Sequence, residues 1–151
     1  MTQQNTDLRL QRANFVVTSL EQSLKLYRDV LGFSLDFVKD SPDASYSYDV
    51  FEIDRDQAIR FAVLSTNTQV RALALTELAG ADLAPVPMPR RAAIVLDVAD
   101  VDAVVSGATA LGCHVYDEEE LITHDGRVGR EVGIVDFDDN LVVIYHIPEA
   151  S

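Results

Sequence analysis

The hydrophobic pattern near the N-terminus predicts a strand, a helix and a second strand in quick succession. Residues 14–18 are rich in β-branched and aromatic side chains, which is typical of a strand. Ser19 followed by Gln22 is a helix-start signal, a capping box. Apolar residues then recur at helical spacing, at Leu20, Leu24, Tyr27 and Leu31. Gly32 stands where helices commonly end, and residues 33–38 resume with the period of two that indicates a strand.

The same order returns in the second half of the chain. Residues 94–98 have strand character, Asp100 is a good N-cap, and residues 114–116 restart a strand after Gly112. The helical face between them consists of Val101, Val104, Val105, Ala108 and Leu111. The two N-caps are 81 residues apart and the two glycines 80 apart. Two independent landmarks therefore indicate an internal duplication.

Each copy continues in segments that the pattern predicts to be extended. These are residues 46–53, 59–64 and 70–78 in the first copy, and 130–135 and 141–147 in the second, with a polar turn at 136–140. Three alternate prolines make residues 79–91 an extended linker. We therefore expect a single α+β domain over residues 1–151, with βαβββ modules at 8–78 and 92–147.

The predicted modules imply a cleft. A four-stranded sheet with one helix covers only one of its faces, so the other face must meet a ligand, a partner or the second module. Two tandem βαβββ modules would thus form curved mixed sheets around a cleft that is lined by alternate residues of several strands.

Composition narrows the class of partner. The net charge of −13 opposes binding to nucleic acid and to anionic membranes, and no apolar run approaches the ~20 residues of a membrane span. The acidic excess serves either solubility or attraction of a cationic ligand, and the acidic run 117–120 suits a solvated loop or edge. Cys113 is the only cysteine and the N-terminus lacks the order of a signal peptide, so we expect a cytoplasmic protein.

Two stretches resemble a known family. Residues 17–33 look like the first-helix signature of the vicinal oxygen chelate superfamily, which includes glyoxalase I, bleomycin-resistance proteins and extradiol dioxygenases. Residues 136–143 resemble its Asp-Pro-x-Gly-Asn turn and final strand, although Phe137 replaces the proline and Asp139 the glycine. The resemblance implies a glyoxalase/bleomycin-resistance-like fold, on which many reactions occur.

The resemblance also implies positions for a divalent metal. Enzymes of this family usually hold it with His or Gln opening the first strand of a module and Glu in the closing strand. Here those positions fall on Arg12, Ala93 and Val143 and near Ala74, while Glu77 is predicted to face the other way. A guanidinium has no lone pair to donate, and Ala and Val have no donor. We therefore expect no metal and no cofactor.

Several residues remain as candidates for binding a small molecule. Arg12 and Asn14 share one face of the first strand, and Arg12 needs either a protein carboxylate such as Glu77 or an anionic ligand. His124, in a predicted hairpin turn, is the best acid/base candidate, because His114 suits a structural role and His146 should face away from the cleft. Aromatic walls with polar tips could come from Tyr46, Tyr48 and Tyr145.

These observations favour a metal-free small-molecule-binding protein similar to the bleomycin-resistance branch, acting as a homodimer. The alternative is a metal-dependent lyase, isomerase or ring-cleaving dioxygenase with atypical ligands such as Glu77 and His124. A third possibility is a dimeric partner module whose cleft is filled by side chains.

Overall fold

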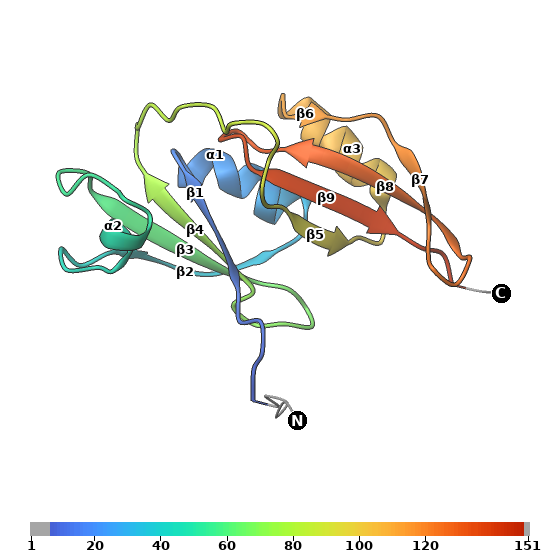
Figure 1. Cartoon of the computed structure of the whole chain (residues 1–151), viewed down its shortest axis with the longest axis horizontal. Coiled ribbons are helices and arrows are strands. Elements are labelled where there is room, and N and C mark those ends of the chain that lie inside the picture. Colours follow the sequence, from blue (N-terminus) through green and yellow to red (C-terminus); the bar gives the residue numbers. More distant parts are fainter. Residues whose placement is uncertain (1–6, 150–151) are drawn as a thin grey trace.

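A computed structural model describes residues 7–149 and contains two mixed β-sheets, each accompanied by helix (Figure 1). The first sheet has the order β1 (Ala13–Val17), β4 (Leu73–Leu78), β3 (Ile59–Ser65) and β2 (Ser34–Asp40). The second has the order β5 (Ile94–Asp97), β9 (Leu141–His146), β8 (Val128–Val135) and β6 (His114–Val115), and β7 (Glu119–Ile122) also pairs with β8. In each sheet one pair, β1–β4 or β5–β9, is parallel and the other pairs are antiparallel. The predicted α+β fold is confirmed.

The helices begin and end where the sequence predicts. Helix α1 (Leu20–Leu24) continues as the π-helix η1 (Lys25–Val30), and α3 (Val101–Ala110) is its counterpart in the second half. The Ser19 side chain accepts a hydrogen bond from the Gln22 backbone N–H, and Asp100 does the same for Ala103, at 3.2 and 3.0 Å. Gly32 and Gly112 follow with φ of 95° and 85°, values that glycine adopts without steric cost.

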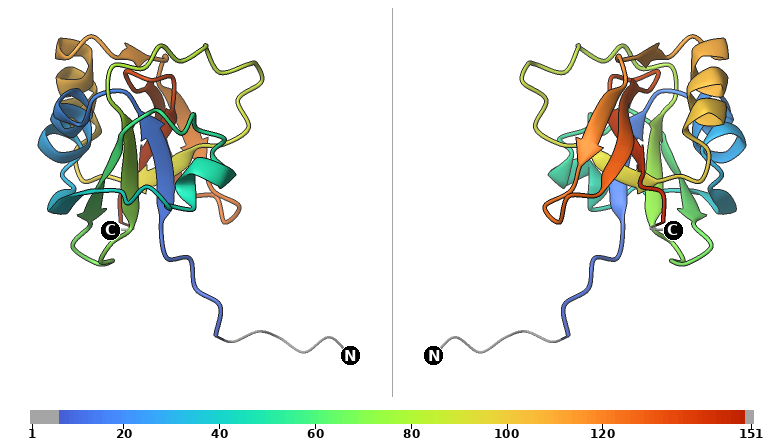
Figure 2. Two further views of the ribbon diagram at one scale, coloured as in Figure 1. Left: turned by 90° about the vertical axis from the view of Figure 1, so that its left-hand side faces the viewer. Right: turned by 90° about the vertical axis from the view of Figure 1, so that its right-hand side faces the viewer.

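Both helices lie on one side of the two sheets (Figure 2), and we call the opposite side the front. One apolar core runs between helices and sheets, with contributions from both halves of the chain; its largest fully buried side chains include Tyr27, Leu26, Leu64, Leu75, Ile134 and Ile144. The helices meet where Gly107 faces Val30, and a Cβ atom at Gly107 would lie 2.9 Å from a Val30 methyl group. Glycine therefore permits the close contact between them.

The segment predicted as a strand at 46–53 is instead a loop that contains the short helix α2 (Ser47–Val50). Tyr46 and Tyr48 alternate as in a strand, but Tyr46 is 73% exposed whereas Tyr48 is buried. The Tyr48 hydroxyl donates to the Gln57 carbonyl at 2.6 Å and folds the segment back on itself. As a result, residues 41–58 cross in front of the first sheet (Figure 2).

Two other strand predictions need correction. The strand expected at 70–78 begins only at Leu73, because Arg71 has a φ of 55°, which is incompatible with extended backbone. In the second half, the acidic run contributes to the edge strand β7, one strand more than the βαβββ plan predicts. β6 and β7 pair with successive parts of β8, so together they occupy the place of a single edge strand.

The turn at residues 136–140 joins the two halves. Asp138 accepts hydrogen bonds from the backbone N–H and the hydroxyl of Thr18, at 3.1 and 2.6 Å. The Tyr27 hydroxyl donates to buried Asp136 at 2.7 Å, and the Asn140 amide donates both to Asp136 and to the Val16 carbonyl. Burial raises the pKa of Asp136 even though these donors oppose the shift. We call this set of contacts the junction.

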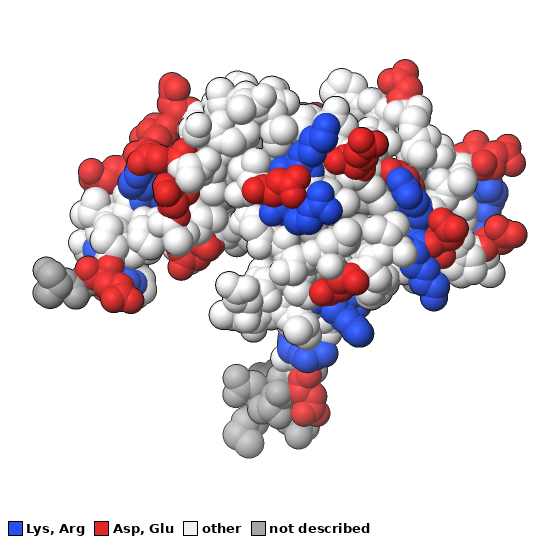
Figure 3. All heavy atoms as spheres, turned by 180° about the vertical axis from the view of Figure 1, so that it is seen from behind, with Lys and Arg blue, Asp and Glu red and all other residues white. Residues whose placement is uncertain are grey.

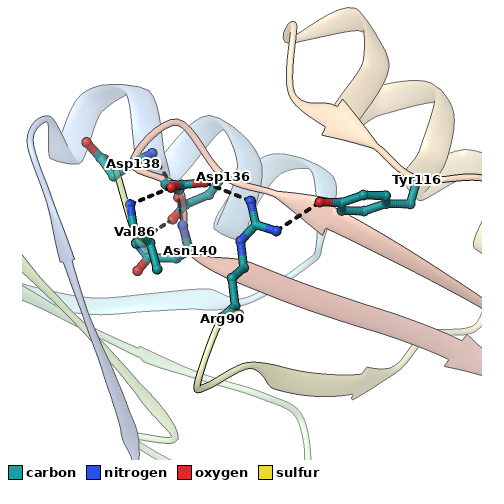
Figure 4. Close-up of polar contacts among 7 residues, drawn as sticks. Val86, Arg90, Tyr116, Asp136, Asp138 and Asn140 are labelled. Atoms are coloured by element: carbon teal, nitrogen blue, oxygen red, sulfur yellow. Dashed lines mark hydrogen bonds and ion pairs between the residues drawn. The ribbon is translucent and has the colours of Figure 1, made fainter. Parts of the chain in front are cut away.

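The linker is fastened to the same turn (Figure 4). Asp139 accepts from the Val86 backbone N–H at 2.7 Å and pairs with Arg90 at 2.8 Å. Arg90 also donates to the Tyr116 hydroxyl at 2.8 Å. Within residues 7–149, no helix is both long and apolar enough to cross a membrane.

Candidate functional site

The front face of the first sheet forms a hollow of about 390 Å³ with the loop at residues 41–58. We call it the first hollow. Its size falls within the range of small-molecule sites. Its lining combines two guanidinium groups, several hydroxyl and amide groups, and an aromatic pair, from Arg12, Arg71, Asn14, Thr76, Phe37 and Phe61 among others.

Strand topology brings the two arginines together. β1 and β4 are parallel neighbours with Ala13 opposite Leu73, so their N-terminal ends lie at the same edge of the sheet. Arg12 directly precedes β1 and Arg71 precedes β4 by two residues. Both also line a second recess at this edge, together with Arg9 and Asp36. The βαβββ order thus places two cations, distant in sequence, side by side.

A β-bulge supplies half of the aromatic pair. The register between β2 and β3 shifts between Leu35 and Phe37, so that Leu35 packs on the core while Phe37 lines the hollow. Without the shift, period-two alternation would place both side chains on one face. The rings of Phe37 and Phe61 meet edge to face at 6.1 Å, and Phe37 is 40% exposed. The hollow therefore offers an accessible aromatic surface.

The polar groups of the hollow present hydrogen-bond donors. The Thr76 hydroxyl donates to the Asn14 side-chain oxygen at 2.9 Å, which leaves the Asn14 NH2 group directed away from this bond. No acidic residue of the segment 7–149 lines the first hollow. Asp36, in the adjacent recess, accepts a hydrogen bond from Ser65. Arg12 and Arg71 form no side-chain hydrogen bond or ion pair with any residue that the structure describes.

Glu77 lies on the helix side of the sheet, as alternation predicts, and the suggested pairing with Arg12 is wrong. Arg60 binds Glu77 instead, at 2.5 Å, because it lies opposite Glu77 in the β3–β4 register. Glu77 also accepts from the Leu20 backbone N–H, at 2.6 Å, at the start of α1. Burial acts to raise the pKa of Glu77, but the hydrogen bonds from Arg60 and Leu20 outweigh it and hold this pKa below its usual value.

The other predicted ligand residues lie apart from Arg12 and Asn14. Tyr46 and Tyr48 belong to the loop at 41–58, yet neither lines the first hollow, and Tyr48 turns its hydroxyl to Gln57. His124 is exposed in the β7–β8 turn, where Thr123 and Arg127 close the hairpin. Tyr145 lies on β9 opposite Glu131, in the second sheet. The structure thus brings together two of the seven predicted residues.

The donors in the first hollow do not fit a divalent cation. The ligand positions that the resemblance implies for the first module fall at Arg12 and near Ala74, both of which line this hollow, and the amide oxygen of Asn14 already accepts from Thr76. A divalent ion requires several N or O ligands in one compact shell, and a guanidinium group and an alanine methyl group supply none. Across residues 7–149, no three His, Cys, Asp or Glu side chains gather closely enough to hold one.

A second hollow, of about 480 Å³, lies on the second sheet and shares no lining residue with the first. Leu141, Val143 and Tyr116 form apolar walls, and the end of the linker from Met88 to Arg90 borders it. Three carboxylates, Asp117, Glu119 and Glu131, line it as well. Because Arg90 is the only cation that the described residues contribute to this lining, the two hollows differ in the sign of their net charge.

Sequence reasoning missed Arg71, Phe37 and Phe61. Arg71 could have been found, because the parallel pairing of first and last strands in a βαβββ module brings the residues just before both strands to the same end of the sheet. Phe37 could not, since only the bulge turns it to the front.

Comparisons with known proteins agree with this fold. The sequence profile of the Glyoxalase/Bleomycin resistance protein/Dioxygenase superfamily matches residues 9–144. No match was found among the curated proteins.

Several solved structures share the architecture. A glyoxalase family protein from Bacillus cereus superposes with a TM-score of 0.73 at 18% identity, covering 99% of this chain and 100% of the other. Glyoxalase I from Leishmania major gives 0.62 at 17% identity, covering 93% and 87%. The fosfomycin resistance protein of Listeria monocytogenes, in complex with Mn(II) and 1S,2S-dihydroxypropylphosphonic acid, gives 0.58 at 17% identity, covering 91% and 90%.

Proposed function

We propose that this chain, which belongs to the Glyoxalase/Bleomycin resistance protein/Dioxygenase superfamily, binds a small molecule in the first hollow. The observation that carries the proposal is the pair of unpaired arginines beside an accessible aromatic pair in a hollow of ligand size. Arg12 and Asn14 would orient the ligand through directed hydrogen bonds, and Phe37 and Phe61 would contact its apolar part.

We also propose that binding proceeds without the divalent metal that is usual in this superfamily. The Listeria monocytogenes protein was solved with Mn(II), which shows that this fold can hold a metal. In the present chain the corresponding surface carries guanidinium and aliphatic groups, which have no electron pair for a metal. This mismatch supports sequestration or metal-independent chemistry over the metal-dependent lyase, isomerase or dioxygenase alternative.

Intrinsic fluorescence can test the site, because the chain contains no tryptophan. Phe61→Trp places a single reporter in the first hollow, and Tyr116→Trp places a matched reporter in the second. A panel of small aromatic compounds should change the emission of Phe61→Trp, saturably, and leave Tyr116→Trp unchanged. Equal responses from both variants, or none from either, would contradict the proposed site.

Metal content distinguishes the alternative. Protein purified without chelator should contain far less than one equivalent of zinc, nickel, manganese or iron, and EDTA should leave the fluorescence titration unchanged. Near-stoichiometric metal that is lost in Glu77→Gln or His124→Ala would instead favour the metal-dependent enzyme.

Homodimer formation and a cytoplasmic location stay predictions. Two hollows that open on one side of each chain provide surface for a second copy. Light scattering on the eluting protein should give twice the 16.6 kDa chain mass, and a single chain mass would contradict the dimer.

A further inference from the structure

We propose that the ligand of the first hollow is a small aromatic anion, whose carboxylate or phosphonate group binds Arg12 and Arg71 and whose ring lies against Phe37 and Phe61. This inference rests on the proposed function and specifies the chemical class of the ligand. Three features of the hollow carry it.

The first feature is that neither arginine has a side-chain partner among the described residues. Most other arginines of the described chain are paired, for example Arg60 with Glu77, Arg90 with Asp139 and Arg130 with Asp102, although the exposed Arg91 is not. Arg12 and Arg71 instead converge on one hollow with no acidic residue in its lining. A guanidinium offers a fork of N–H donors that matches a carboxylate or a phosphonate, so two of them form a receptor for one anionic group.

The second feature is the backbone of Arg71. Its φ of 55° lies in the left-handed region, which is unfavourable for a residue with a long side chain. The Arg71 backbone N–H donates to the Ser65 hydroxyl at 2.7 Å, and Ser65 donates in turn to Asp36 in the bulge, so a chain of two hydrogen bonds holds this conformation. Glycine would adopt it freely, yet the position carries an arginine that faces the hollow.

The third feature is local charge. The chain has a net charge of −13, but the recess that adjoins the first hollow adds Arg9 and only one acid, Asp36. The surroundings of Arg12 and Arg71 are thus cationic within an acidic protein. The second hollow, with three carboxylates, would repel the same ligand. An anionic ligand should therefore bind in the first hollow and not in the second.

The test uses the full chain and four probes with one ring and different head groups. We expect benzoate and phenylphosphonate to bind in calorimetry and to change the emission of Phe61→Trp, with weaker binding at higher salt. Benzamide and benzylamine should bind at least about tenfold more weakly, because they cannot form charge-assisted bonds to guanidinium. The preference between benzoate and phenylphosphonate identifies the head group as planar or tetrahedral.

Matched variants assign the effect to the two arginines. Arg12→Ala and Arg71→Ala should each weaken benzoate or phenylphosphonate binding by about 10-fold to 100-fold. Arg91→Ala removes an exposed arginine away from the hollow and should leave the affinity unchanged. Arg71→Glu should shift the preference from benzoate toward benzylamine.

The possible results separate this inference from the proposed function. If benzamide binds as tightly as benzoate, and the arginine variants bind like the parent while Phe61→Trp still responds, the hollow is a binding site but the anion assignment is wrong. If none of the four probes binds, both the anion assignment and the use of this hollow for aromatic ligands are wrong.

Discussion

The two halves of the molecule share their helix side and differ on their front side. Each has a side-chain N-cap, a helix that ends at a glycine with positive φ, and a parallel strand pair at one edge of its sheet. Their charges differ widely: residues 8–78 hold eight basic and ten acidic residues, whereas residues 92–147 hold two basic and twelve acidic ones. One front face carries two arginines that pair with no described residue, whereas the other carries three carboxylates and one arginine.

This difference indicates that core packing constrains the helix side of the molecule but not the front side. The helix side must fit a shared core, so caps, glycines and apolar positions repeat in both halves. Viewed from behind, charged groups of both signs are scattered over its outer surface (Figure 3). The front faces do not enter this core and can differ without disturbing it. The comparison therefore predicts that substitutions at the helix side and the junction change stability, whereas substitutions at the front change binding.

The largest effect is expected at the junction. Asp136→Ala removes the acceptor of four hydrogen bonds, from Tyr27, Asp138 and, twice, Asn140, and leaves buried donors without partners. The free energy of unfolding should fall by about 3 kcal/mol, as measured by urea denaturation. Asp117→Ala, at an exposed front position, should change it by less than about 0.5 kcal/mol. Equal losses of stability in the two variants would contradict the assignment of stability to the junction.

A smaller effect is expected from paired glutamates on the two sides. Glu77→Gln weakens the contacts to Leu20 and to half-exposed Arg60, and should cost about 1 kcal/mol at neutral pH. Glu131→Gln, on the front of the second sheet, should cost almost nothing. Urea denaturation of both variants at pH 7 provides the measurement.

The stability contributed by Glu77 should also depend on pH. Because the pKa of Glu77 is lowered in the fold, its charge stabilises the protein above its ordinary pKa, and this contribution is lost as the pH falls through the lowered value. The stability gap between the parent and Glu77→Gln should therefore be widest near pH 7 and close toward pH 3. A gap that widens in acid would contradict the assigned direction.

The smallest effect is a gain. Arg71→Gly relieves an unfavourable φ and should raise the free energy of unfolding by about 0.5 kcal/mol, while binding of the aromatic anion is lost. Arg12→Gly, where φ is not positive, should instead lower stability slightly. Thermal unfolding of the two variants distinguishes them. A loss of stability in Arg71→Gly would show that its side chain contributes to the fold.

The elements that sequence reasoning predicted correctly depend on local chemistry. Ser19 and Asp100 cap helices through bonds within their own first turn, and Gly32 and Gly112 end them through their own backbone. The strand predicted at 46–53 was wrong because burial of Tyr48 depends on Gln57, a contact within a loop that crosses the sheet. Alternation alone could not distinguish that loop from a strand.

The candidate site was predicted only in part, for a related reason. Arg12 and Asn14 could be predicted, because side chains alternate along the first strand and that strand lies directly before the helix N-cap. Arg71 requires the strand order of the sheet, and Phe37 requires a bulge that sequence periodicity does not reveal. Glu77 was placed on the correct face, but its partner Arg60 comes from the antiparallel register, which sequence alone does not fix.

The turn at 136–140 belongs by sequence to the second half, yet its side chains complete the end of β1 in the first. An excised N-terminal fragment would expose the Thr18 amide and the Val16 carbonyl, and an excised C-terminal fragment would expose Asp136 with no phenol beside it. Neither half is a self-sufficient building block, so transplanting one front face onto another scaffold would require transferring the junction as well.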